Sequence, residues 1–221
     1  MARQERGVRT RRAILEAMAS LIDEVGYGAA TITMLVERTG LTRGALYFHF
    51  ASKEEMARGV LAEALTSEGV REQNLKLQEW VDVGMVLAYR LPREPLMSAA
   101  ITLSIDTKVR RILGTRWPDW VDLGRGLLDE AGRRGELLPH ADPHTASRLF
   151  VGAWTGVQVV RETLPGSPEL VEEISALYQL ILPNLATAGV LARLDTSPHR
   201  AEQLARSIPD ARAESVYVPA L

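Results

Sequence analysis

The chain has 221 residues, of which 46% are hydrophobic and 24% are charged, with a net charge of -2 and no cysteine. This length is enough to bury an ordinary hydrophobic core, the composition excludes an intrinsically disordered chain, and the small net charge indicates no partner. The lack of cysteine excludes a disulfide framework, a thiolate zinc site and a cysteine nucleophile, and it favours a reducing, cytoplasmic location. The longest apolar stretch, residues 149–160, is too short to cross a membrane.

The first expected helix covers roughly residues 9–25 and follows a basic segment. Residues 1–12 contain five arginines and a single acidic residue. Residues 1–60 carry nine Lys or Arg against seven Asp or Glu, a net charge of +2, which leaves about -4 for the rest of the chain. This asymmetry is typical of a nucleic-acid-binding head on an acidic body. The helix itself is indicated by apolar residues at helical spacing: Ile14, Leu15, Met18, Leu21, Ile22 and Val25.

Two short helices are expected after Gly26, which ends the first helix. Thr31 is the predicted N-cap of one of them. Gly40 suits a left-handed backbone in the following turn, and Thr42 is predicted to cap the next helix, residues 43–48. The pattern is that of a helix-turn-helix, whose second helix docks on the first helix of the chain through apolar residues: Leu41, Leu46 and Phe50.

The remaining helix starts are indicated by a capping box and by prolines. Ser52 and Glu55 are spaced to satisfy each other's backbone donors, so a long helix is expected from residue 53. Prolines suit the first turn of a helix, and five of them are predicted to mark further starts: Pro95, Pro118, Pro143, Pro168 and Pro198. No alternating run typical of a strand appears, so the predicted fold is all-α. We expect a head of residues 1–52, a helical body of residues 53–208 and a flexible tail of residues 209–221.

The helix-turn-helix exposes residue types suited to reading double-stranded DNA. Six residues lie at the start or on the outer face of its second helix: Thr42, Arg43, Gly44, Ala45, Tyr47 and His49. Arg43 can donate two hydrogen bonds to a guanine edge, Gly44 and Ala45 allow a close approach to the groove, and the others can reach phosphates. Lys53, at the positive end of the next helix, is a further predicted phosphate ligand.

The chain resembles TetR-type repressors in three features: three consecutive helices, a basic segment ahead of them and the string GALYFHFASKEE at residues 44–55. Strings at residues 1–17, 41–54, 117–137 and 149–160 look like the γ-butyrolactone autoregulator receptors of Streptomyces and relatives, so the resemblance runs to about residue 183. It implies a homodimer on a pseudo-palindromic operator that represses antibiotic and regulatory genes until a butyrolactone, butenolide or furan signal releases it. It also implies DNA contacts at Thr42, Arg43, Gly44, Tyr47, His49 and Lys53.

The resemblance implies effector contacts at Trp120, Thr155 and Gln158. A tryptophan offers a flat apolar face and one N–H to a small ligand, although on sequence alone a tryptophan such as Trp120 is more often an ordinary core residue. Thr155 and Gln158 lie three residues apart and so share one helix face. Their hydrogen-bond partner could be a ligand carbonyl or hydroxyl, a backbone carbonyl or a second subunit. Several relatives carry arginine in place of Thr102, which leaves the effector's identity open, and lysine in place of Arg43, which is a mild change.

Two long, largely apolar helices are expected at residues 142–164 and 167–186. Such faces must be covered, and Gly152, Ala153 and Gly156 would allow close helix approach. We therefore expect these helices to form a four-helix interface between two copies of the chain.

No enzyme, metal or cofactor is expected. His140, Asp142 and His144 form an H-x-D-x-H string, but Asp142 is explained as the cap before Pro143, and no further ligand is evident. No nucleophile elbow, phosphate loop or dinucleotide fingerprint appears. The remaining alternatives are a pseudo-receptor that answers antibiotics or other small molecules and a DNA-binding regulator that needs no ligand.

Overall fold

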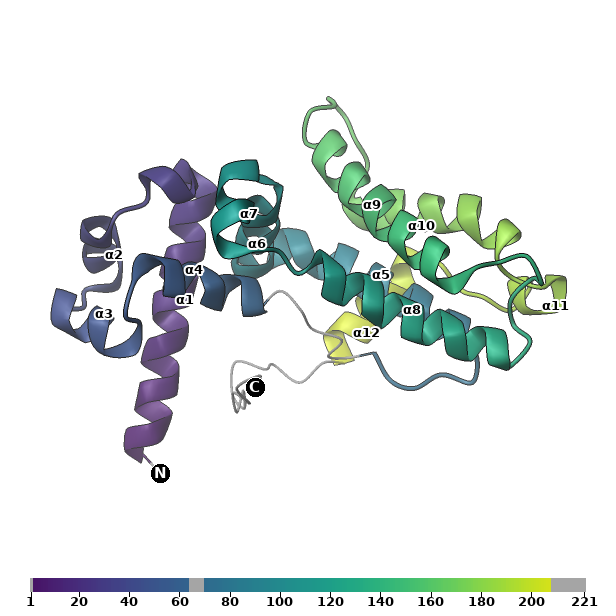
Figure 1. The fold of residues 1–221 in the computed structure, drawn as a ribbon, viewed down its shortest axis with the longest axis horizontal. Coiled ribbons are helices and arrows are strands. Elements are labelled where there is room, and N and C mark those ends of the chain that lie inside the picture. The colour runs from purple at the N-terminus through teal and green to yellow at the C-terminus, as the bar shows by residue number, and fades with distance from the viewer. Residues whose placement is uncertain (1, 64–69, 208–221) are drawn as a thin grey trace. The chain divides into compact units, whose positions relative to one another are not determined.

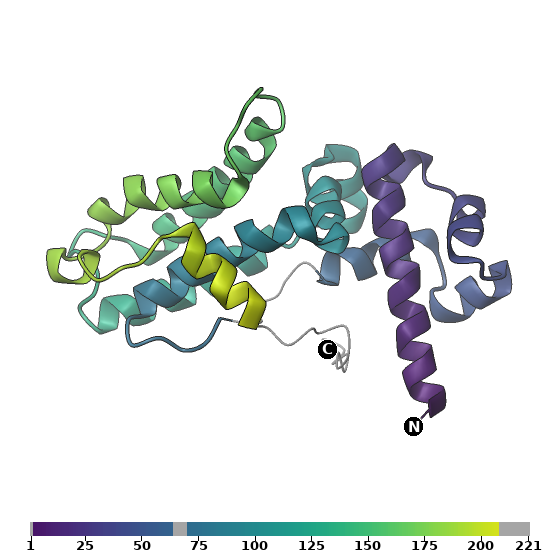
Figure 2. The same ribbon diagram turned by 180° about the vertical axis from the view of Figure 1, so that it is seen from behind.

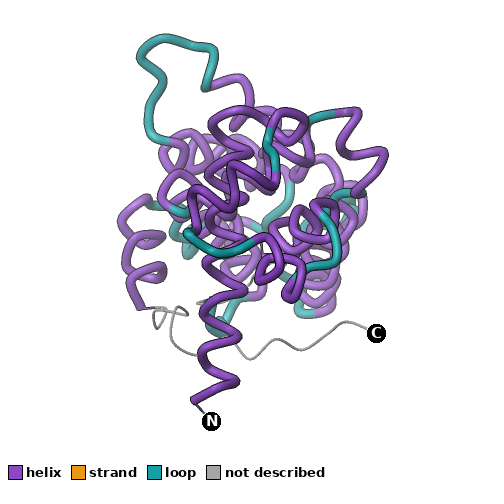
Figure 3. Tube along the Cα trace, turned by 90° about the vertical axis from the view of Figure 1, so that its left-hand side faces the viewer, coloured by secondary structure: helices purple, strands orange, loops and turns teal. Residues whose placement is uncertain are grey.

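The computed structural model describes residues 2–63 and 70–207, and every regular element within these ranges is a helix (Figure 1 and Figure 3). The predicted all-α fold is therefore confirmed. None of the described helices is long and apolar enough to cross a membrane. The predicted flexible tail, residues 209–221, lies outside the described residues.

The chain divides into two compact units, each built from two stretches of sequence. The first comprises residues 1–66 and 90–120, and the second comprises residues 67–89 and 121–221. This division reflects which residues pack together and does not test where the DNA-binding part of the chain ends. The predicted functional boundary after residue 52 therefore stays a prediction.

The first unit is built around a long helix that begins earlier than the sequence pattern indicated. α1 (Ala2–Ala29) takes in the arginine-rich segment, because arginine is a good helix former even where no apolar stripe marks a helix. Its continuous helix ends where expected, at Gly26, whose φ of 78° lies in the left-handed region.

Besides α1 and the start of α8, the described part of this unit contains α2 (Ile32–Thr39), α3 (Arg43–His49), α4 (Lys53–Glu63), η1 (Leu91–Arg93), α6 (Pro95–Ile105) and α7 (Thr107–Leu113). α6 contains no charged residue, and it packs against both α1 and α4. Their shared core removes large apolar side chains from water, which is the main stabilising term of such a unit. Its members include Ile14, Leu15, Met18, Leu35, Leu46, Phe50, Met56, Val60, Ala99 and Leu103.

The local signals that predicted the helix-turn-helix are confirmed. Thr31 Oγ1 accepts from the backbone N–H of Met34 at 3.2 Å, and Gly40 has a φ of 67°. Thr42 Oγ1 accepts from the N–H of Ala45 at 3.2 Å. These caps satisfy orphan donors at two helix starts and fix the turn between α2 and α3.

The capping box at the start of α4 is confirmed in one half only. Ser52 Oγ accepts from the N–H of Glu55 at 3.1 Å, as expected. The Glu55 carboxylate reaches one residue further back than predicted and accepts from the N–H of Ala51 at 2.5 Å.

The second unit is a bundle of four longer helices closed by short ones. It contains α5 (Lys76–Arg90), most of α8 (Trp117–Arg133), α9 (Pro143–Arg161), α10 (Leu170–Ile181), η2 (Leu182–Asn184), α11 (Ala188–Leu191) and α12 (Pro198–Ser207). Three aromatic rings from α5, α9 and α10 form its centre: Trp80, Phe150 and Tyr178, with ring centroids 4.6 to 5.1 Å apart. Such ring pairs stabilise beyond the area they bury. α12 crosses α5 on the outside of this bundle (Figure 2).

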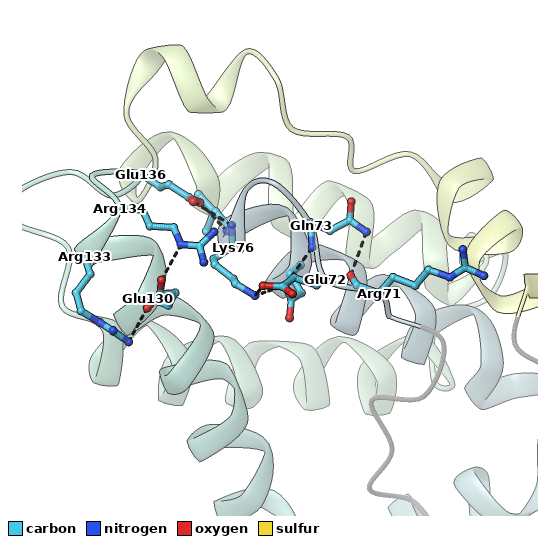
Figure 4. Close-up of polar contacts among 10 residues, drawn as sticks. Arg71, Glu72, Gln73, Lys76, Glu130, Arg133, Arg134 and Glu136 are labelled. Carbon is cyan, nitrogen blue, oxygen red and sulfur yellow. Dashed lines mark hydrogen bonds and ion pairs between the residues drawn. The ribbon is translucent and has the colours of Figure 1, made fainter.

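The start of α5 is held by a carboxylate that lies 60 residues away in the sequence. Glu136, which is 3% exposed, accepts from the backbone N–H groups of Lys76 at 3.0 Å and Leu77 at 2.8 Å. The Lys76 ammonium binds the carboxylates of Glu72 and Glu79, at 3.1 and 2.8 Å (Figure 4). Glu136 thus acts as a non-local helix cap.

The proline rule located three helix starts correctly and failed once. Pro95, Pro143 and Pro198 are the first residues of α6, α9 and α12, and Pro118 is the second residue of α8. The prediction at Pro168 was wrong, because α10 begins two residues later, at Leu170. Glu169 forms a capping box with Glu172 there, and this cap outweighs the proline signal.

Candidate nucleic-acid interface and effector residues

α3 buries one face and exposes the other. Leu46 and Phe50 are 0% and 1% exposed in the core of the first unit. Because residues four apart share a helix face, the opposite face turns to solvent. Of the predicted DNA-binding residues, Thr42, Arg43, Gly44 and Tyr47 are exposed, and Ala45 and His49 are half-buried.

Arg43 occupies the first turn of α3 with an exposed side chain that makes no ion pair or hydrogen bond with any residue the structure describes. Its guanidinium is therefore available for a planar, bidentate contact. Beside it, a Cβ added to Gly44 would meet no heavy atom within 4 Å, so the surface here is open. An open helix start with a free guanidinium is the arrangement that major-groove reading requires.

Phe48 belongs to this surface, and the sequence prediction missed it. Its ring is 85% exposed, which is the largest value among the exposed apolar side chains of the described residues, and packs edge-on against His49 at a centroid distance of 5.3 Å. An exposed phenylalanine can contact a thymine methyl group. The sequence position of Phe48 could have indicated its exposure, because Tyr47, Phe48 and His49 all lie between the buried Leu46 and the buried Phe50.

Lys53 lies at the start of α4 and is held against α1. Its Nζ donates to the backbone carbonyl of Tyr27 at 2.5 Å and lies 4.3 Å from the centre of that tyrosine ring. Partial burial lowers the pKa of Lys53, an effect that the nearby Glu54 carboxylate opposes. An ammonium group has three donors, so the Tyr27 contact positions Lys53 and leaves donors for a phosphate.

The arginine-rich turns of α1 extend past α2 and α3 (Figures 1 and 2). Arg11 lies over the ring of Phe50, with its guanidinium carbon 4.6 Å from the ring centre, so this part of α1 borders the end of α3. Arg6 and Arg9 are exposed. The first unit therefore presents cations on α1 as well as on α3.

α1 and α2 are joined by a charged clamp. Arg38 donates from both terminal nitrogens to the Glu24 carboxylate, at 2.7 and 2.6 Å, and also to Ser20 Oγ at 2.5 Å. The hydrogen bonds from Arg38, and then that from Ser20, lower the pKa of Glu24.

The predicted effector residues fall in different units. Trp120 is half-buried and is the last residue of the first unit, whereas Thr155 and Gln158 lie on α9 in the second. Thr155 is half-buried and Gln158 is buried. The sequence pattern did not predict a role for Trp117, which lies one turn before Trp120. The indole nitrogen of Trp117 is buried without a hydrogen-bond partner among the described residues.

Asp142 acts as a helix cap, as predicted. Its Oδ1 accepts from the N–H of Thr145 at 2.7 Å, and hydrogen bonds from Thr145 lower the pKa of the carboxyl. Within residues 2–63 and 70–207, no three His, Asp or Glu side chains gather in a way that could hold a metal ion.

Known proteins resemble this chain over most of its length. Residues 14–60 match the family described as bacterial regulatory proteins, tetR family. The A-factor receptor protein of Streptomyces griseus is 34% identical over 220 residues, which cover 96% of this chain and 79% of that protein. The crystal structure of native TylP, a TetR regulator from Streptomyces fradiae, has a TM-score of 0.83 and 36% identity, covering 92% of this chain and 99% of that one. A γ-butyrolactone receptor described as ArpA-like shares the fold, with a TM-score of 0.73 at 24% identity over 91% of this chain and 98% of that one. The helix-turn-helix and this similarity along nearly the whole sequence establish that the chain belongs to the TetR family and is a DNA-binding transcriptional regulator.

Proposed function

We propose that this regulator is a repressor that binds a pseudo-palindromic operator as a homodimer and is released by a γ-butyrolactone-like signal, a butyrolactone, butenolide or furan. In this role it would control genes for antibiotics or other secondary metabolites. The observation that carries the DNA-binding part is the open outer face of α3, where the guanidinium of Arg43, beside Gly44, has no partner among the described residues. The cytoplasm, where the operator lies, is the location that this role requires.

On operator DNA, we assign base reading to Arg43, with Gly44 and Ala45 at the groove edge. Thr42, Tyr47, His49 and Lys53 contact phosphates and set the register of the helix. Phosphate contacts supply most of the affinity, and the arginines of α1 add to them. The head of residues 1–52 and the adjoining Lys53 carry all of these groups.

The homodimer is proposed to form through α9 and α10. Four large apolar side chains on or just after these helices are more than half exposed: Leu149 at 58%, Val160 at 53%, Leu164 at 55% and Leu180 at 76%. A Cβ at Gly152 or Gly156 would meet nothing within 4 Å, so a partner helix could approach α9 closely there. Pairing places two recognition helices on one DNA face, about 34 Å apart in successive major grooves.

The effector proposal rests on the name of the Streptomyces griseus relative, a receptor for A-factor, and on the strings shared with γ-butyrolactone receptors. Trp120 is assigned to the apolar part of the ligand, and Thr155 and Gln158 to its polar groups. An effector releases DNA only if it binds the released conformation more tightly than the DNA-bound one.

Footprinting of the full chain on the promoter of its own gene and of neighbouring genes tests the proposal. Two protected half-sites one helical turn apart, whose protection disappears when γ-butyrolactone is added, would support it. Protection that only antibiotics relieve would favour a pseudo-receptor, and protection that no small molecule relieves would favour a ligand-independent regulator. A single unpaired half-site would contradict the dimer.

A further inference from the structure

Gln158 in the last turn of α9 carries a buried acceptor whose partner is missing from the described chain. The residue is 8% exposed, and its Oε1 is buried without a hydrogen bond to any described residue. Its Nε2 donates to the Glu162 carboxylate at 2.7 Å. A carboxylate only accepts hydrogen bonds, so it holds the amide with the nitrogen towards Glu162 and the oxygen away from it. The buried atom that has lost its contact with water and gained no hydrogen bond in exchange is therefore Oε1, an acceptor.

Thr155, one turn earlier on the same face of α9, already uses its only hydroxyl proton. Its Oγ1 donates to the backbone carbonyl of Val151 at 2.8 Å. A hydroxyl has one donor, so the remaining hydrogen-bonding capacity of Thr155 is that of an acceptor. Thr155 and Gln158 thus present two oxygen acceptors three residues apart on one helix face.

The charges around this part of α9 oppose an anion. Glu162 follows within four residues, and the last turn of a helix carries a partial negative charge. The nearby cation, Arg161, is already paired: its Nε lies 3.4 Å from the Glu173 carboxylate in an ion pair that makes no hydrogen bond, and one of its terminal nitrogens donates to the carbonyl of Pro168 at 2.8 Å. A carboxylate ligand would meet two acceptors and a like charge here.

We infer that the site formed by Thr155 and Gln158 takes a hydrogen-bond donor of the effector, a neutral hydroxyl group, and disfavours a carboxylate. The inference rests on the proposed function and narrows it: among γ-butyrolactone-like signals, a hydroxyl-bearing neutral lactone fits this site, and a furan carboxylate does not. The hydroxyl donates its proton to Gln158 Oε1, and Thr155 Oγ1 offers a second acceptor.

Three probes of equal alkyl-chain length test the inference on the wild-type chain bound to its operator. They are a γ-butyrolactone with a hydroxyl on the first carbon of its side chain, the same lactone without that hydroxyl, and an alkylfuran carboxylate. We expect the hydroxylated lactone to release the operator at about tenfold lower concentration than its deoxy analogue, because one buried hydrogen bond is at stake. The carboxylate should be weaker than the hydroxylated lactone.

Gln158→Leu removes the acceptor at similar volume and should make the two lactones equally effective. Gln203→Leu, which changes an exposed glutamine of α12, should leave the tenfold preference intact. The oligomeric state of both variants is measured by analytical ultracentrifugation.

Release of the operator by both lactones at equal concentration on the wild type would overturn the inference and leave the proposed function standing. Retention of the preference in Gln158→Leu, together with a weakened dimer, would overturn it as well and assign Oε1 to the subunit interface. If no lactone releases the operator at all, the proposed effector class fails, and this inference falls with it.

Discussion

Arg200 of α12 binds Asp82 of α5 through two parallel hydrogen bonds, each 2.7 Å long. The Asp82 side chain is 1% exposed, and the pair spans 118 residues of sequence. Gln78 adds a third bond to the same carboxylate at 2.7 Å and ties it to the backbone of Asp195. This bidentate contact raises the pKa of Arg200 and fastens the last described helix to the centre of the second unit.

Removing the arginine of this pair should destabilise the second unit strongly. Among the described residues, Arg200→Ala leaves the buried Asp82 carboxylate with Gln78 as its one side-chain hydrogen-bond partner, and we expect the free energy of unfolding to fall by about 3 kcal/mol. Arg206→Ala is the matched control, because its pair with Glu202 leaves 73% of the arginine side chain exposed and should cost less than about 1 kcal/mol. Urea denaturation of the three proteins measures both values. Equal midpoints for the two variants would show that the Asp82 pair does not hold α12.

Arg43→Ala should weaken operator binding by about 1 to 3 kcal/mol and relax the preference for one base pair, since alanine cannot make the two hydrogen bonds to the base edge. Fluorescence anisotropy on the operator and on single-base variants measures both effects. Arg125→Ala, on an exposed face of α8, should change neither. Unchanged affinity and specificity in Arg43→Ala would remove this residue from base reading.

The arginines at the start of α1 should contribute charge without sequence preference. Replacing Arg6 and Arg9 by alanine should reduce the slope of log affinity against log salt concentration by about 0.9 for each phosphate that these arginines neutralise. The double Arg→Lys variant keeps both charges and should keep the slope. If the alanine variant has the wild-type slope, these turns of α1 do not contact the DNA backbone.

The Arg38–Glu24 clamp should make the head sensitive to acid. The pKa of Glu24 is lowered, chiefly by the hydrogen bonds from Arg38, so its stabilising contribution is full above the ordinary glutamate pKa and is lost as the pH falls through the lowered value. A carboxyl titration by NMR should show the pKa of Glu24 rising towards the ordinary glutamate value in Arg38→Ala. Ser20→Ala should raise it less, because Ser20 is the second cause. An identical titration in wild type and Arg38→Ala would contradict the clamp.

The helix-turn-helix could be predicted because its determinants are local. Thr31, Gly40 and Thr42 each act within three or four residues of themselves, so residue type and spacing suffice. The early start of α1 could not be predicted, because a basic segment without an apolar stripe gives no periodic signal. The same holds for contacts between distant segments, such as Glu136 capping α5 and Arg200 binding Asp82.

The candidate site shows the same division. The exposure of Arg43 and Tyr47 follows from the periodicity of α3, whereas the exposed Phe48 was missed because an apolar residue in a short helix is first assumed to be core. The sequence placed Thr155 and Gln158 on one face but left the ligand group open between carbonyl and hydroxyl. Only the bonds to Val151 and Glu162 show which protons are already used.

The central claim, release of an operator by a γ-butyrolactone-like signal, is tested most directly by measuring operator affinity with and without a saturating signal, for the wild type and for Trp120→Ala. We predict that the signal lowers wild-type affinity about 100-fold, equivalent to about 3 kcal/mol of coupling, and that Trp120→Ala binds the operator normally without responding. Wild-type affinity that stays unchanged in the presence of every butyrolactone, butenolide and furan would contradict the claim, and release that persists in Trp120→Ala would contradict the assignment of Trp120.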